Sequence, residues 1–186
     1  MNSVSIIVTC EEQQSQLRQL LPGLLSLQYG GEYEVIVVDK THDKDLAEWL
    51  KEMKVHYPHL CHTFCSKTAS IPPKMKRGGG FTHRLALTLG AKAACYDWLL
   101  LLPSRLSAYP LGEHWISRLV ENIGEKTDVV VGRTGRRHWW HRLTFNLFRR
   151  KFPIFRPTSS IILCRRSILL QTTPFVPTKR VIYQPL

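Results

Sequence analysis

Short apolar runs alternate with segments of helical periodicity over the first two thirds of the chain. The runs are rich in Val, Ile and Leu and are bounded by polar or turn-forming residues, which predicts buried strands. Strands that alternate with helices are typical of a doubly wound, mostly parallel α/β sheet. The predicted strands span residues 4–8, 34–38, 60–64, 98–102 and 128–131.

Four segments between these strands have the spacing of amphipathic helices. Leucines recur at helical spacing from Leu17 to Leu27, although Pro22 must start, kink or interrupt that helix. A second helix follows the second strand, with Asp43 or Asp45 as its predicted N-cap. The other two predicted helices span residues 81–95 and 110–122, and a loop rich in Pro, Gly and Lys at 71–80 precedes the first of them.

The character of the chain changes after Gly132. The strand at 128–131 is the last clear one, and the following segment mixes bulky aromatic side chains with arginines. We therefore predict an α/β domain over residues 1–132 and a basic, aromatic C-terminal appendage over residues 133–186. The prolines near the end of the chain predict that it is extended or loosely attached.

The net charge of the chain is concentrated in that appendage. Residues 1–128 carry 14 Lys and Arg against 14 Asp and Glu, whereas residues 129–186 carry 12 Lys and Arg and no carboxylate, which accounts for the formal net charge of +12. Such asymmetry indicates an anionic partner: a bilayer surface, a nucleic acid or an acidic protein. The alternative is a solvated basic face that only aids solubility.

Compartment is predicted from what the sequence lacks. No apolar stretch approaches the roughly 20 residues of a membrane span. The apolar run at 4–8 is too short for a signal peptide, so we expect a cytoplasmic protein. Its five cysteines are expected to be free thiols. Cys10, at a strand end, is the thiol to test for exposure, with burial as the default.

Two strands end in chemically different residues. The strand at 34–38 is followed by Asp39, and the strand at 98–102 is followed by Pro103, Ser104 and Arg105. Ligands of open α/β sheets bind at the carboxyl ends of the strands. A proline and an arginine cannot hold a divalent cation, which prefers oxygen ligands, so we expect no metal cofactor. Arginine is, however, a good bidentate partner for phosphate.

Two other candidate sites are weaker. His and Cys residues crowd positions 56–65 and suggest zinc, but no second ligand pair follows nearby. If residues 60–64 form a strand, Cys61 and His62 also point to opposite faces. Ordinary strand and loop residues are the favoured interpretation. The glycines at 78–80 lack the order of residues that a phosphate-binding P-loop needs.

The collinear order of these parts resembles the family-2 glycosyltransferases, which have a single nucleotide-sugar domain of the GT-A fold. The resemblance covers about residues 3–131, and it implies that residues 1–132 bind a nucleotide sugar of the UDP or GDP type. Lys40 departs from the family pattern, which commonly has a second acidic residue there. The matching segments are residues 4–9, 34–39, 85–94 and 97–101. The nucleotide-binding residues implied are Thr9, Glu11, Asp39 and Arg84.

Two departures concern catalysis. The family's metal-binding Asp-x-Asp falls on Pro103, Ser104 and Arg105, and no carboxylate follows Asp128 that could serve as the general base. His138 and His141 could accept a proton but occupy no recognisable motif. These departures predict a glycosyltransferase-like protein with lost or much reduced sugar transfer. The alternatives are an active metal-independent transferase acting on a membrane or surface glycan, and a non-enzymatic membrane or nucleic-acid adaptor.

The basic aromatic segment after residue 137 has three interpretations. Its aromatic side chains could enter the headgroup region of a bilayer while its arginines meet anionic lipids. They could equally complete the core, and nucleic-acid binding ranks third. The resemblance favours peripheral attachment at the inner membrane face, within a glycan-assembly complex. The residues concerned are Trp139, Trp140, Arg142, Phe145, Phe148, Arg149 and Arg150.

Overall fold

The computed structural model describes most of the α/β region and three segments of the C-terminal third. The described residues are 2–11, 14–65, 79–102, 114–125, 127–133, 160–170 and 180–185, and side chains are described for all of these except 79–84, 133, 160 and 180–185.

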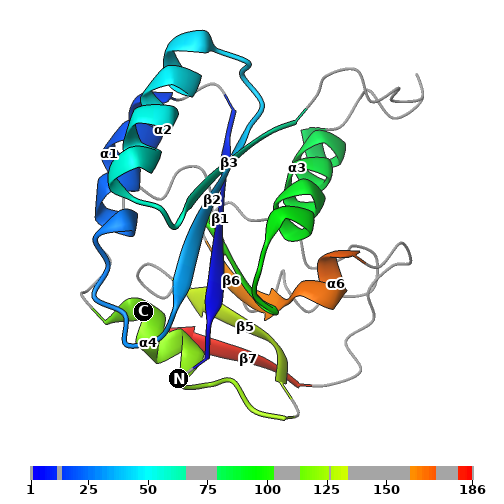
Figure 1. The fold of residues 1–186 in the computed structure, drawn as a ribbon. Coiled ribbons are helices and arrows are strands. Elements are labelled where there is room, and N and C mark those ends of the chain that lie inside the picture. Colours follow the sequence, from blue (N-terminus) through cyan, green and yellow to red (C-terminus); the bar gives the residue numbers. More distant parts are fainter. Residues whose placement is uncertain are drawn as a thin grey trace.

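The described strands form one seven-stranded mixed sheet in the order β3-β2-β1-β4-β6-β5-β7 (Figure 1). Strands β1, β2, β3 and β4 run parallel to one another. Strand β6 is antiparallel to both of its neighbours, and β7 is parallel to β5. The expected mostly parallel α/β sheet is confirmed. The strands are β1 (Val4–Cys10), β2 (Tyr33–Asp39), β3 (Leu60–Phe64), β4 (Trp98–Leu102), β5 (Thr127–Arg133), β6 (Ser160–Arg165) and β7 (Arg180–Pro185).

The two most apolar strands lie near the middle of the sheet. Every residue of β1 and of β4 is buried, because helices cover both faces there. Continuous apolar runs are typical of such strands, since neither face meets water. Residue Ser5 of β1 is polar and fully buried, and its hydroxyl donates a 2.6 Å hydrogen bond to Glu34 Oε1.

Helices pack on both faces of the sheet (Figure 1). Helices α1, α2 and α4 cover one apolar cluster, and α3 and α6 cover the other. Gly90 lets α3 approach closely, because a Cβ there would lie 2.7 Å from Cγ2 of Ile7. The helices are α1 (Gln14–Leu25), α2 (Lys44–His56), α3 (Gly79–Ala93), α4 (Trp115–Val120) and α6 (Arg166–Leu170).

The structure settles two points that the sequence left open: the effect of Pro22 on α1 and the identity of the N-cap of α2. Helix α1 runs through Pro22 and ends at Leu25, and the backbone N–H and hydroxyl of Ser26 both donate to the Pro22 carbonyl. Asp43, rather than Asp45, is the N-cap of α2, where its side chain accepts from the Leu46 N–H at 3.1 Å. Hydrogen bonds from Gln14 and Leu46 lower the pKa of Asp43, as expected for a capping carboxylate.

The expectation that 128–131 is the last clear strand was wrong. Strands β6 and β7 come later in the chain, and β6 inserts between β4 and β5. Residues 161–164 of β6 are buried, with Ile161 and Leu163 in one apolar cluster and Ile162 and Cys164 in the other. The sheet therefore extends across the predicted boundary at residue 132.

No helix within the described ranges is long and apolar enough to cross a bilayer.

Candidate functional site

The candidate site lies at the carboxyl edge of the parallel strands. Cys10, the last residue of β1, pairs in register with Asp39, the last residue of β2. On the other side of β1, Val8 pairs with Leu102 at the end of β4. Three strand ends therefore meet at one edge, which is where open α/β sheets bind ligands.

Asp39 is fully buried at this edge and only half of its carboxylate is satisfied. Oδ1 accepts two hydrogen bonds from Thr41, one from the backbone N–H and one from the hydroxyl, both 2.7 Å long. The Asp39 carbonyl also accepts from the Cys65 N–H at 2.8 Å, which joins the ends of β2 and β3. The other carboxylate oxygen, Oδ2, is buried and has no hydrogen-bond partner.

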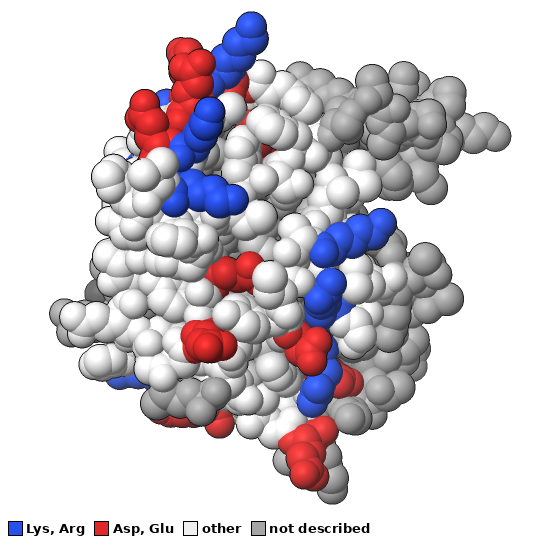
Figure 2. Space-filling model, viewed as in Figure 1, with Lys and Arg blue, Asp and Glu red and all other residues white. Residues whose placement is uncertain are grey.

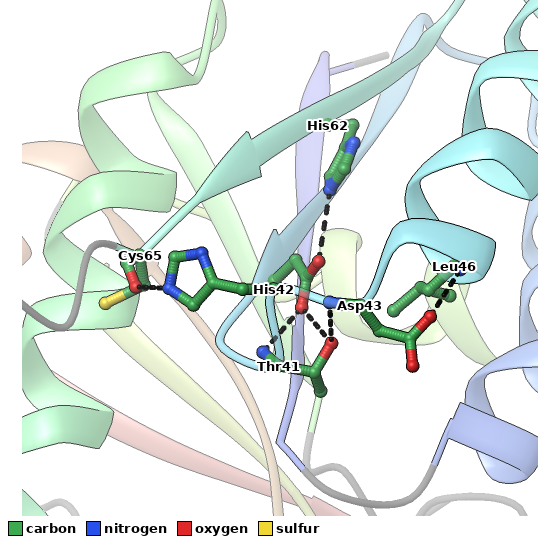
Figure 3. A network of polar contacts seen from close by, with 7 residues as sticks. Thr41, His42, Asp43, Leu46, His62 and Cys65 are labelled. Atoms are coloured by element: carbon green, nitrogen blue, oxygen red, sulfur yellow. Dashed lines mark hydrogen bonds and ion pairs between the residues drawn. The ribbon is translucent and has the colours of Figure 1, made fainter.

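His62 of β3 faces that free oxygen. Its Nε2 lies 3.7 Å from Asp39 Oδ2 and is itself buried without a hydrogen-bond partner (Figure 3). Burial lowers the pKa of His62, while the Asp39 carboxylate opposes that effect. The site therefore holds a carboxylate oxygen and a ring nitrogen, side by side and both unsatisfied.

An aromatic group borders this pair. The Phe64 ring packs against His62 with a centroid separation of 4.4 Å, and His42 stacks on Phe64 at 6.0 Å with nearly parallel rings. Phe64 is 49% exposed, so part of an apolar ring faces solvent at the carboxyl edge.

His42 itself is in a strained conformation. It has a φ of 58°, which non-glycine residues rarely adopt. Its Nε2 lies 2.9 Å from the Cys65 carbonyl (Figure 3), so its ring connects the β2–α2 loop to the end of β3. Strained residues of this kind often occur at functional sites.

The structure separates Thr9 from Asp39, although the resemblance assigned both to the nucleotide. Thr9 pairs with Val38, so it points to the sheet face under α3, whereas Asp39 points to the face under α1 and α2. The Thr9 hydroxyl is buried and has no hydrogen-bond partner. Glu11 lies beside the same edge in an ion pair with Lys40, the departure from the family pattern.

Several predicted site residues lie outside what the structure describes. The backbone of Arg84 is in α3, but its side chain is not described. Pro103 and Arg105 lie in the segment after β4 that is outside the described residues. The same is true of the predicted membrane or anion contacts Trp139, Trp140, Arg142, Phe145, Phe148, Arg149 and Arg150.

Cys10 is buried, as the default expectation had it, and the exposed thiol lies elsewhere. Burial, with the nearby Asp39 charge adding to it, raises the pKa of the Cys10 thiol to about 11. The exposed thiol is Cys95, which follows α3. The sequence did not distinguish the buried thiol from the exposed one, because Cys10 ends an apolar strand and Cys95 closely follows an apolar helix.

The described residues contain no group of three or more His, Cys, Asp or Glu side chains that could hold a metal ion. Residues 60–64 do form a strand, and Cys61 and His62 pair with Ile36 and Val37, so they point to opposite faces. Asp128, the last acidic residue in the sequence, is the second residue of β5, which runs parallel to β4. It therefore lies at the opposite edge of the sheet from Asp39, with its Oδ1 3.9 Å from Arg165 Nε.

Four residues of the site were missed or undervalued from sequence. His62 was considered only as a zinc ligand, and Thr41, His42 and Phe64 were not considered. Thr41 carries a usable signal, because an Asp followed two residues later by Thr often forms a turn closed by side-chain hydrogen bonds. His62 and Phe64 depend on the register between β2 and β3, which the sequence alone does not specify.

Comparisons with known proteins identify the fold. No family model matches the sequence, and no curated protein sequence matches it. Among solved structures, the chain is similar to the mannosyltransferase PcManGT from Pyrobaculum calidifontis in complex with GDP-Man and Mn2+, with a TM-score of 0.64 and 18% identity over 98% of this chain and 54% of that one.

Two further structures are similar. One is glucosyl-3-phosphoglycerate synthase from Mycobacterium tuberculosis in complex with Mg2+ and UDP, with a TM-score of 0.62 and 15% identity over 100% of this chain and 69% of that one. The other is S. aureus TarS 1-349, with a TM-score of 0.53 and 17% identity over 91% of this chain and 48% of that one.

These likenesses show a GT-A-type glycosyltransferase fold, as the resemblance implied. The chain spans only about half the length of the mannosyltransferase. At identities this low, a shared fold does not determine the activity, because one fold supports many functions.

Proposed function

We propose that this chain is a glycosyltransferase-like protein that binds a UDP- or GDP-type nucleotide sugar at Asp39 and has lost most or all sugar transfer. The observation that carries the proposal is the buried, unpartnered Oδ2 of Asp39 at the carboxyl edge of a GT-A-type sheet. A buried carboxylate oxygen without a hydrogen-bond donor is rare, and a ring N–H of a nucleobase would supply one.

A divalent metal does not fit the residues present. Strand β4 ends at Leu102, and the next residues are Pro103, Ser104 and Arg105, which offer no carboxylate. Arg105 could contact the diphosphate directly, since its guanidinium stays charged and binds phosphate in a bidentate manner. Charge stabilisation of the leaving group by a metal would be missing.

The loss of transfer is also supported by the distribution of carboxylates. Deprotonation of an acceptor hydroxyl needs a base within hydrogen-bond reach. Asp128 is the second residue of β5 and lies at the edge of the sheet opposite Asp39, and residues 129–186 contain no Asp or Glu. Two described carboxylates near the same edge have other partners: Glu11 pairs with Lys40, and Asp43 caps α2.

Calorimetric titration with UDP-glucose and GDP-mannose, with and without Mn2+, tests the proposal. We expect one of them to bind without a requirement for metal, and Asp39→Ala to abolish binding. Asp45→Ala is the matched control, since Asp45 is an exposed carboxylate on α2. Metal-dependent binding or turnover by the purified protein would contradict the proposal, and binding unaffected by Asp39→Ala would place the site elsewhere.

A second candidate, a membrane or nucleic-acid adaptor, is favoured only by the charge asymmetry. The face shown in Figure 2 carries charges of both signs, with acidic and basic side chains together over α1 and α2. Most of the basic residues after Asp128 lie outside the described residues. Flotation with anionic vesicles tests this candidate. Vesicle binding that Trp139→Ser and Trp140→Ser abolish, together with no nucleotide binding, would favour the adaptor, whose proposed place is a glycan-assembly complex.

A further inference from the structure

The free oxygen of Asp39 faces a histidine, and the two groups do not satisfy each other. Asp39 Oδ2 and His62 Nε2 are 3.7 Å apart, which is too long for a hydrogen bond. Both atoms are buried and neither has another hydrogen-bond partner. Two changes would satisfy Asp39 Oδ2. The imidazole of His62 can become protonated and move into hydrogen-bond distance, or a donor from a ligand can replace the imidazole beside the carboxylate.

The groups around His62 come from three elements. Asp39 of β2 faces its Nε2, Phe64 of β3 packs against its ring, and the charge of Lys54 on α2 lowers its pKa. His42 reaches it only through the stack on Phe64. On β1, Cys10 lies beside Asp39, but its thiol, with a pKa of about 11, stays neutral in the range where histidine titrates.

We infer that His62 competes with the nucleobase for Asp39 and thereby makes nucleotide binding dependent on pH. A base N–H donates to Oδ2 only after the imidazole has turned away from it. This inference rests on the proposed function, because it concerns the same carboxylate oxygen.

The protonation state of His62 decides how much free energy is needed to turn its ring away from Asp39. A neutral ring at 3.7 Å makes no hydrogen bond with Asp39, so little is lost when it turns away. A protonated ring beside a buried carboxylate forms a charge-assisted contact, which a ligand must break. Binding is therefore tighter when His62 is neutral, and by linkage a bound nucleotide sugar lowers the pKa of His62.

Calorimetric titration on either side of the ordinary histidine pKa, at about pH 5.5 and about pH 8, measures the effect. The probes are UDP-glucose and GDP-mannose, whose diphosphate diesters keep a constant charge over this range. Because burial lowers the pKa of His62, only part of the protein carries the protonated ring at the lower pH, and we expect the wild-type protein to bind about twofold more tightly at the higher pH. His62→Gln should bind equally at both, because it does not titrate. His56→Gln, an exposed histidine on α2, is the matched control and should behave as wild type.

A second measurement examines the pair without any nucleotide. An NMR titration of His62 should give a lower pKa in Asp39→Asn than in wild type, because the Asp39 charge raises it. If His62→Gln folds poorly, His62→Asn replaces it.

The outcomes separate the two proposals. If the pH dependence of binding persists in His62→Gln, or if His62→Gln loses binding at both pH values, His62 does not compete with the nucleobase. The proposed nucleotide site is unaffected by either result. No binding by wild type at either pH overturns the proposed function and the competition with it. A His62 pKa that is unchanged in Asp39→Asn shows that the two side chains do not interact, and it also overturns the competition.

Discussion

Thr41 donates two hydrogen bonds to a single oxygen of Asp39, one from its backbone N–H and one from its hydroxyl. The same hydroxyl accepts from the Asp43 N–H at 3.2 Å, just before α2 begins. The turn between β2 and α2 is therefore closed by side chains, and it holds the Asp39 carboxylate with its second oxygen toward His62.

Thr41→Val should destabilise the protein by about 1–2 kcal/mol, because it removes the hydroxyl from a buried carboxylate and from the Asp43 N–H. Urea unfolding measures the change. Thr63→Val is the matched control: Thr63 lies on β3, on the face opposite His62, and this change should stay within about 0.5 kcal/mol. Equal effects of the two substitutions would show that the turn is not held by this hydroxyl.

Gly90→Ala should also destabilise the protein, although alanine is the better helix former. The added Cβ would meet Ile7 Cγ2 at 2.7 Å, and crowding of a packed core costs about 1–3 kcal/mol, more than the roughly 1 kcal/mol gained in helix propensity.

Gly23→Ala is the control for that prediction. Gly23 lies in α1 with nothing within 4 Å of its added Cβ, so the substitution should leave thermal stability unchanged or raise it. A stabilised Gly90→Ala protein would mean that α3 can move away from β1 at little cost.

The pH dependence of stability should contain a contribution from His62. Because burial lowers its pKa in the folded protein, the unfolded chain takes up a proton first as the pH falls. The contribution is complete above about pH 7 and is lost as the pH drops through the unfolded value of about 6.5 toward the lower folded one. Urea midpoints at about pH 7.5 and 5.5 should therefore differ less in His62→Gln than in wild type. An equal difference in both proteins would exclude His62 as the source.

Glu34→Gln should make Cys95 more reactive. The Glu34 carboxylate is the main cause of the raised pKa of Cys95, and its Oε1 accepts from the Cys95 N–H at 2.6 Å. Removing the charge lowers that pKa and increases the fraction of thiolate, which is the reactive form. Iodoacetamide labelling at mildly alkaline pH, followed by peptide mass spectrometry, should be a few-fold faster at Cys95.

Glu32→Gln serves as the control for Cys95, since Glu32 is an exposed carboxylate that does not contribute to the raised Cys95 pKa. Labelling of Cys164 should stay negligible in every folded variant. That thiol is buried, which raises its pKa to about 12. Faster labelling of Cys95 in both variants would indicate local opening rather than an electrostatic effect.

The sequence predicted the parallel half of the sheet well, because its strands are continuous apolar runs. The predicted bounds of β3 and β4 agree with the structure, while β1 and β2 extend beyond the predicted 4–8 and 34–38. At its carboxyl end, β1 is longer than predicted by Thr9 and Cys10, and β2 by Asp39. Backbone pairing between the two strands continues through these residues, past the apolar run on which the prediction was based.

The C-terminal strands and the polar pair could not be predicted in the same way. Strand β6 holds a short apolar run of a length that suits a strand or a buried helix, and only its antiparallel pairing with β4 and β5 makes it a strand. Of the polar pair, Asp39 was identified from sequence, because it directly follows an apolar run. The approach of His62 to it depends on which residue of β3 lies beside Val37.

The position of β6 has a consequence during synthesis of the protein. This strand fills the gap between β4 and β5, yet it follows both in the chain. About 60 residues must be translated after β4 before its partner β6 exists, which takes about 3–12 seconds at usual ribosome speeds. During that interval an apolar strand has an open edge to which other chains can add. The yield of native protein should therefore rise with a lower growth temperature and with more chaperone, and it should depend on these conditions more than on the equilibrium stability of the folded protein.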